Sequence, residues 1–302
     1  MKILITGATG LVGSVLVKKS IAHGHSVHYL TTRKNQLDGI EHAKGFYWNP
    51  KKNEIDAACF EGVDVLLHLA GASISQRWTT KNKKEILDSR VEGTKLLVNA
   101  LAALEGKHQL KQVVAASAIG IYPSSFTALY TETYDPQPNS FLERVVIAWE
   151  EAEDGFTTLG IPLSKMRIGL VLTKEGGVLA PLKIPTLFGL GAAFGSGKQF
   201  QSWIHVDDLV QLLLAAAQQG WEGVYNAVSP KAVSQGEFMK QLAKAMGRPY
   251  FMPPLPKWPV RLVAGEMSTL IFNSQAVSAE KVLNKGFKFS HTDLFTAIKS
   301  LV

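Results

Sequence analysis

The chain has 302 residues, and 46% of them are hydrophobic, which is enough apolar surface for one large domain or for a domain with a smaller lobe. Its single cysteine, Cys59, excludes an internal disulfide framework and a cysteine-rich metal site. The formal net charge of +7 comes from scattered lysines, so it indicates solvated surface or a phosphate-bearing small ligand and argues against a nucleic-acid partner.

No segment indicates a membrane or a secretory destination. The longest apolar run, at 209–217, is far shorter than the roughly 20 residues that a spanning helix needs. The chain also begins directly with a strand and a glycine turn and not with a signal sequence. We therefore expect a cytoplasmic protein with no membrane partner and no metal.

The first half of the chain alternates segments with strand and helix patterns. Strands are predicted at 3–6, 26–31, 63–71, 112–117 and 164–172, and helices at 11–23, 79–104 and 139–153. Such alternation predicts an α/β fold with a Rossmann-type, doubly wound parallel sheet and right-handed crossovers.

After about residue 172 the composition changes. Glycines cluster at 189–198 and prolines at 250–259, and one clear helix is predicted between them, at 205–220. We predict a Rossmann domain at 1–172, to which parts of 200–230 return, and a smaller α/β substrate-binding lobe at 173–302.

A glycine turn with the spacing G-x-x-G-x-x-G connects the first strand to the first helix. Glycines allow a tight turn and a close approach of a pyrophosphate, which the helix N-terminus then binds through its free N–H groups. At this place in an alternating chain the turn predicts a dinucleotide site, although a tight turn without a ligand stays the alternative. The predicted cofactor residues are Thr6, Gly7, Gly10, Leu11, Val12 and Gly13, together with Leu69, Ala70 and Gly71 at the end of a neighbouring strand and Arg90 on the following helix.

The end of the second strand distinguishes the two nicotinamide cofactors. An NAD site usually has a carboxylate there, which accepts a hydrogen bond from the ribose. This chain has Thr32, Arg33 and Lys34 instead, and a guanidinium matches a 2′-phosphate. We therefore predict NADP(H), with NAD(H) as the less favoured alternative. His68, in an otherwise apolar strand, is predicted to be a structural hydrogen-bonding residue.

These motifs together resemble the extended short-chain dehydrogenase/reductase superfamily, which includes nucleotide-sugar epimerases and dehydratases. The resemblance rests on "TGATGLVGS", "HLAG", "VEGTKLL", "SAIGIYP", "RIGLVL", "SWIHVDDLV" and "YNAVSP", in the order and spacing of that superfamily. "WEEAE" and the tail "MSTLIFNSQAVSAEKVLNKGFKF" resemble an uncharacterised epimerase-like branch, some of whose members carry the label cell-division inhibitor. By analogy alone, the resemblance leaves open a homodimer through the helix at 79–104.

The resemblance implies a Ser, a Tyr and a Lys that act together, and this chain lacks two of them. Ser117 matches the serine, but the tyrosine position falls on Phe141 or Leu142 and the lysine position on Val145 or Val146. None of these four side chains can transfer a proton. The only literal Tyr-x-x-x-Lys, Tyr47 to Lys51, contains Pro50 and is interpreted as coincidence.

Several other residues remain candidates for the chemistry. Tyr122 is the best substitute for the missing tyrosine, with a packing role as its alternative. Arg167 is assigned weakly to substrate, or to bracing a loop, and Trp203 to stacking on a ligand, or to the core. His205 and Asp207 are expected to dock the lobe, and Glu143 and Arg144 are expected to face solvent.

Two functions follow, because the dinucleotide-binding motif is present and the tyrosine and lysine for proton transfer are absent. The first is an NADP(H)-binding, epimerase-like oxidoreductase with a non-standard active site and an unknown small polar substrate. The second is a catalytically silent protein that reports NADPH status to a partner. A DNA-binding role ranks far behind both.

Overall fold

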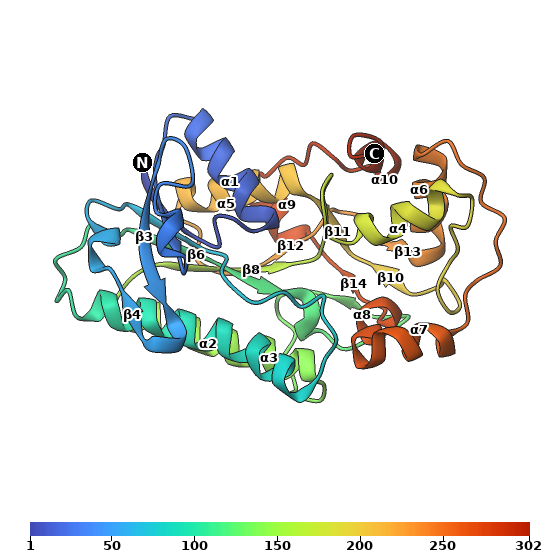
Figure 1. Cartoon of the computed structure of the whole chain (residues 1–302), viewed down its shortest axis with the longest axis horizontal. Helices are drawn as coiled ribbons and strands as arrows, with labels where there is room; N and C mark the ends of the chain where they lie inside the picture. The colour runs from blue at the N-terminus through green and yellow to red at the C-terminus, as the bar shows by residue number, and fades with distance from the viewer.

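The computed structural model describes all residues from Met1 to Val302, around a central sheet of eight strands (Figure 1). The strand order is β12-β8-β6-β5-β1-β2-β3-β4, and every pair is parallel except β3 with β4. This confirms the predicted Rossmann-type sheet. The strands are β1 (Lys2–Thr6), β2 (Ser26–Thr31), β3 (Ala43–Asn49), β4 (Glu54–Ile55), β5 (Val65–His68), β6 (Gln112–Ala118), β8 (Leu163–Ile168) and β12 (Gly223–Ala227).

Helices cover both faces of the sheet. Ile3 and Ile5 of β1 pack into a core with α1 (Leu11–Ala22) and α5 (Val206–Gln219). Leu4 packs into a second core with α2 (Thr80–Ala102) and α3 (Phe141–Thr158), because alternate side chains of a strand point to opposite faces. Figure 1 shows α1 and α5 above the sheet and α2 and α3 below it.

Two apolar segments form shorter strands than their sequences predict. Strand β5 ends at His68, because the N–H groups of Leu69 and Ala70 donate to Thr6 Oγ1, at 3.0 Å each, and not to a neighbouring strand. The predicted strand at 164–172 divides at Gly169, where a Cβ atom would lie 2.4 Å from the carbonyl oxygen of Ser202. Beyond it, β9 (Leu170–Leu172) leaves the central sheet and pairs with β11 (Trp203–His205).

Strand β3 is absent from the predicted elements. Its sequence, AKGFYWN, has a lysine and a glycine near its start and is only half-buried, so it lacks the continuous apolar run of the inner strands. Tyr47 lies in this strand and Lys51 in the 3-10 helix Pro50–Lys52, so their spacing is a coincidence, as predicted.

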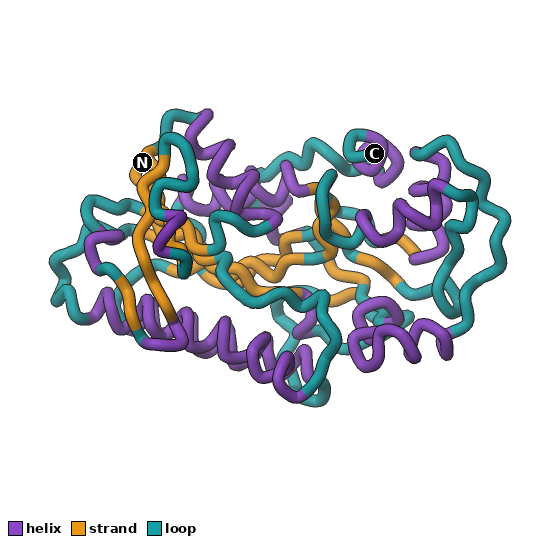
Figure 2. Tube along the Cα trace, viewed as in Figure 1, coloured by secondary structure: helices purple, strands orange, loops and turns teal.

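The remaining elements form the lobe and the connections to it, and most of them lie on the right in Figures 1 and 2. Three short strand pairs join distant segments: β9 with β11, β10 with β13, and β7 with β14. The division of the chain at residue 172 stays a prediction. None of the helices is long and apolar enough to cross a bilayer. The elements are β7 (Leu129–Tyr130), α4 (Leu179–Leu187), β10 (Phe200–Gln201), β13 (Val233–Ser234), α6 (Gln235–Ala245), α7 (Lys257–Ala264), α8 (Thr269–Phe272), β14 (Ala276–Val277), α9 (Glu280–Asn284) and α10 (Leu294–Lys299).

Candidate functional site

The glycine turn lies between β1 and α1, and two of its three glycines cannot be replaced without moving backbone. Gly7 has a φ of +70°, and a Cβ atom there would lie 3.1 Å from the backbone of Leu69 and Ala70. A Cβ atom on Gly13 would lie 2.1 Å from the carbonyl oxygen of Gly7. The glycines thus allow the turn, the start of α1 and the end of β5 to come together.

The N-terminus of α1 carries free hydrogen-bond donors. Gly10 is the N-cap and supplies no side-chain cap, and the first turn contains no acidic residue. The N–H groups of Leu11, Val12 and Gly13 have no acceptor in the chain. Free N–H groups and the positive end of a helix dipole together suit an anion such as a pyrophosphate.

A hydrogen-bonded chain through His68 fixes the geometry around this turn. Thr94 Oγ1 donates its one hydrogen to the carbonyl oxygen of Arg90, so it must accept from His68 Nε2, 3.0 Å away. His68 Nδ1 then accepts from Thr6 Oγ1, 2.8 Å away. Because His68 is fully buried and both ring nitrogens are occupied, its predicted structural role is confirmed.

The buried His68 makes stability depend on pH. Burial lowers the pKa of His68 from its ordinary value of 6.5 to about 4. As the pH falls from 6.5 to 4, the unfolded chain therefore takes up a proton that the folded chain does not. Unfolding titrations should show the native chain losing about 3 kcal/mol more stability over this range than a His68→Gln variant, whose amide does not titrate. Equal losses in the two proteins would contradict the buried, neutral imidazole.

The loop after β2 places the three predicted 2′-phosphate residues beside the glycine turn, because β1 and β2 are neighbours in the sheet. Thr32, Arg33 and Lys34 are all exposed, and neither cation pairs with a carboxylate. Lys34 Nζ lies 4.8 Å from the centre of the Tyr47 ring. The loop therefore presents an unpaired guanidinium and a hydroxyl next to the glycine turn.

A buried polar network lies below the carboxyl ends of β6, β8 and β12. Ser117, Arg167 and Asn226 occupy one row across these strands, in direct register. Arg167 donates through Nε and Nη2 to the two carboxylate oxygens of Glu150 on α3, at 2.9 Å each, and through Nη1 to Tyr122 Oη at 3.0 Å. Ser117 Oγ donates to the same carboxylate, and Tyr122 Oη donates to Asn226 Oδ1 at 2.7 Å.

The network brings together the two predicted catalytic residues but surrounds them with protein. Ser117 is 2% exposed and Tyr122 is 1% exposed, and both hydroxyl groups donate to protein acceptors. Burial raises the pKa of Tyr122, and the nearby Arg167 only partly offsets this effect. The catalytic assignment stays a prediction, and the geometry gives both residues a role in holding the loop that follows β6.

The weaker substrate assignments have structural alternatives that fit better. Arg167 is 4% exposed and its guanidinium is bonded to Glu150 and Tyr122, which is the bracing role. Trp203 is fully buried in the apolar core of the lobe, so its ring is not available for stacking on a ligand. The contacts favour the bracing role of Arg167 and the core role of Trp203, and the two substrate assignments stay predictions.

Helix α3 carries no proton-transfer group at the expected positions. Leu142 and Val145 pack with Trp78 and Ile86, and the Phe141 ring lies against Trp78 with 5.0 Å between centroids. The prediction that Glu143 faces solvent is wrong. Glu143 is 6% exposed because it closes a capping box with Ser140 at the start of α3.

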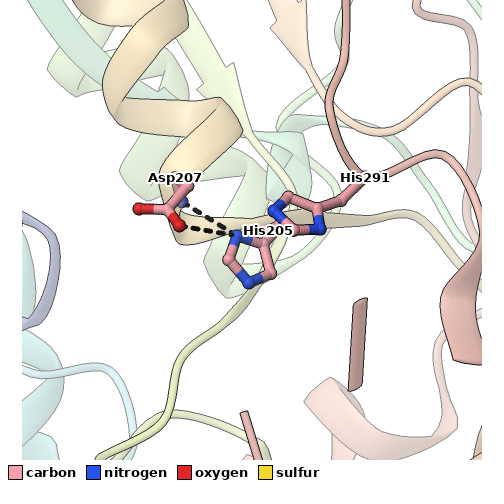
Figure 3. Close-up of side chains that lie close together, drawn as sticks. All are labelled: His205, Asp207 and His291. Atoms are coloured by element: carbon pink, nitrogen blue, oxygen red, sulfur yellow. Dashed lines mark hydrogen bonds and ion pairs between the residues drawn. The ribbon is translucent and has the colours of Figure 1, made fainter. Parts of the chain in front are cut away.

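His205, Asp207 and His291 form a compact cluster where α5 meets the C-terminal segment (Figure 3). His205 Nδ1 caps α5 by accepting from the N–H of Asp207, and Asp207 pairs with Lys19 of α1 at 2.7 Å. The two imidazole rings stack with 3.7 Å between centroids, and His205 Nδ1 is already occupied by the N–H of Asp207. The cluster docks the C-terminal segment, as predicted for His205 and Asp207.

Comparison with known proteins matches most of the chain to two family models. Residues 3–153 match the NAD dependent epimerase/dehydratase family, and residues 255–301 match a domain family of unknown function, DUF1731. An epimerase family protein of Staphylococcus saprophyticus is 36% identical, over 99% of this chain and 98% of the relative.

Solved structures of similar proteins share the fold over the whole chain. The human epimerase family protein SDR39U1, solved with NADPH, is 29% identical with a TM-score of 0.87, over 100% of this chain and 99% of the human one. A nucleoside-diphosphate sugar epimerase of Corynebacterium glutamicum is 28% identical with a TM-score of 0.78, over 100% of this chain and 58% of that one. The predicted resemblance to extended short-chain dehydrogenases/reductases is confirmed.

Proposed function

The chain belongs to the NAD-dependent epimerase/dehydratase family, and on that premise we propose that it binds NADP(H) and acts as an epimerase-like oxidoreductase on a small polar substrate. The observation that carries the proposal is the set of free N–H groups at Leu11, Val12 and Gly13, with an unpaired Arg33 beside them. The human relative solved with NADPH supports the choice of ligand.

The residues present fit such a cofactor. The missing side chains at Gly7 and Gly13 let a pyrophosphate approach the start of α1, and the loop at 32–34 offers a guanidinium and a hydroxyl to a 2′-phosphate. When bound, the cofactor would supply hydride transfer, and the chain's own groups would bind it, orient it and exclude water.

Arg33 should determine the preference for the phosphorylated cofactor. We expect Arg33→Ala to weaken NADPH binding by about tenfold or more, since a charge-assisted hydrogen bond to a phosphate contributes roughly 1.5–3 kcal/mol. NADH binding should stay within about twofold of the native value, because NADH has no group for this guanidinium. Calorimetric titration of both cofactors into both proteins measures this. Equal weakening of NADPH and NADH would contradict the assignment.

A second function, NADPH binding without turnover, is favoured by a specific observation. Helix α3 has apolar residues where the resemblance expects a tyrosine and a lysine, and the Tyr122 hydroxyl is buried. Oxidation of NADPH followed at 340 nm against a panel of carbonyl compounds separates the two functions. Turnover that falls in Ser117→Ala or Tyr122→Phe favours the enzyme, whereas binding with no turnover favours the sensor.

A further inference from the structure

Arg90, on α2, has an open hydrogen-bonding edge at the end of β5. Its Nη1 donates to the carbonyl oxygens of Ala72 and Ile86, at 3.2 and 2.9 Å. Its Nε and Nη2 have no acceptor in the chain, and no carboxylate lies within ion-pair distance. These two nitrogens form the fork that binds the paired oxygens of a phosphate or carboxylate.

Arg167 shows how the Nε and Nη2 of an arginine bind when a carboxylate is within reach. Its Nε and Nη2 bond both oxygens of Glu150. Lys165, the other buried cation, pairs with Asp154 at 2.6 Å. Arg90 is partly buried and lacks such a partner, and burial lowers its pKa to about 10. A desolvated cation without a counter-charge is costly, so an anion should bind it.

The surroundings of Arg90 hold the guanidinium in place. Gly71 leaves room for the guanidinium, because a Cβ atom at this position would lie only 3.2 Å from Arg90 Cζ. On the other side the guanidinium carbon lies 5.0 Å from the centre of the Trp149 ring on α3. The buried indole Nε1 of Trp149 also has no acceptor. The guanidinium therefore lies against a ring that carries a second donor without an acceptor.

The order of the strands identifies which part of a dinucleotide reaches Arg90. In the proposed function, which this inference rests on, the 2′-phosphate lies at the end of β2 and the pyrophosphate at the end of β1. Strand β5 is the neighbour of β1 on the other side. The nicotinamide half must therefore extend over the end of β5, where Gly71 and Arg90 lie.

We propose that Arg90 binds the nicotinamide-side phosphate and ribose of the dinucleotide and supplies the cation that α3 lacks at Val145 and Val146. The fork at Nε and Nη2 would bind the phosphate oxygens, and Gly71 leaves the space for this contact. Arg90 is in this sense a cofactor-positioning residue and not an acid or base.

The test compares two ligands, NADPH and adenosine 2′,5′-bisphosphate, which lacks the nicotinamide half. Arg90→Met should weaken NADPH by about tenfold or more and leave the bisphosphate within about twofold of native, because only NADPH reaches the fork. Arg90→Lys should also weaken NADPH, since an ammonium cannot reproduce the fork. Arg144→Met, at an exposed arginine on α3, is the matched control and should change neither ligand.

The outcomes separate this inference from the proposed function. Unchanged NADPH affinity in Arg90→Met, or in Arg90→Lys if the first variant does not fold, would overturn the role of Arg90 alone. Equal weakening of both ligands would also overturn it, by indicating that Arg90 only supports the fold. A native chain that binds neither ligand would overturn the proposed function and this inference together.

Discussion

Replacing Gly13 with alanine should abolish measurable cofactor binding, with a loss of affinity of about a hundredfold or more. The new Cβ atom would lie 2.1 Å from the carbonyl oxygen of Gly7 and 2.8 Å from its carbonyl carbon. The turn and the start of α1 must then separate, which moves the free N–H groups away from the anion. Fluorescence titration with NADPH, together with a thermal melt of each protein, measures the effect.

A second glycine supplies the matched control. Gly93 lies inside α2, and a Cβ atom there would be 3.5 Å from its nearest neighbour, Trp48, which is an ordinary contact. Gly93→Ala should therefore bind NADPH like the native chain and melt at the same temperature or higher, because alanine favours a helix. Native affinity in Gly13→Ala would contradict the close approach of turn and helix.

Neutralising Glu150 should cause the largest loss of stability among single changes in the buried network. Glu150→Gln leaves Arg167, 4% exposed, without its counter-charge. Breaking a buried ion pair from one side costs about 3–5 kcal/mol, so we expect a loss of that size in the free energy of unfolding. Denaturant unfolding followed by circular dichroism measures it.

An exposed pair provides the comparison for this variant. Lys84 and Asp88 form an ion pair one turn apart on α2, and the side chain of Asp88 is 43% exposed. Asp88→Asn makes the same acid-to-amide change and should cost about 0.5 kcal/mol or less. If Glu150→Gln costs no more than Asp88→Asn, then the Glu150–Arg167 pair does not hold the network together.

The features that the sequence predicts well are local ones. The glycine turn, each strand or helix pattern and the lack of a tyrosine and a lysine at the expected positions of α3 each depend on residues within one short segment. The turn requires glycine at positions 7 and 13 because a side chain there would meet backbone atoms. The place of the turn between a strand and a helix already indicates this requirement. The family resemblance adds the order of the later motifs.

The buried network could not be predicted in the same way. It joins Ser117, Tyr122, Glu150, Arg167 and Asn226, which come from three strands, a helix and a loop. Their contact depends on strand register, which places Ser117 and Asn226 on either side of Arg167. Helical spacing alone does not tell which glutamates of "WEEAE" turn inward, and two of them, Glu150 and Glu153, are buried. Burial also raises the pKa of Glu153.

The contacts between the C-terminal segment and the loop after β6 show a second limit, because they are long-range and polar. Gln275 Nε2 donates to the carbonyl oxygens of Ile119 and Tyr122, and Ser274 exchanges hydrogen bonds with Ser124 and Ser125. The C-terminal segment thus braces the loop that follows β6. No sequence pattern within either segment indicates this partner.

The central claim is that the turn at 7–13 binds a phosphorylated nicotinamide dinucleotide, and direct calorimetric titration of the native chain tests it. We predict saturable heat from NADPH and binding of NADH that is weaker by about tenfold or more. Heat from neither dinucleotide at any accessible concentration would contradict the claim.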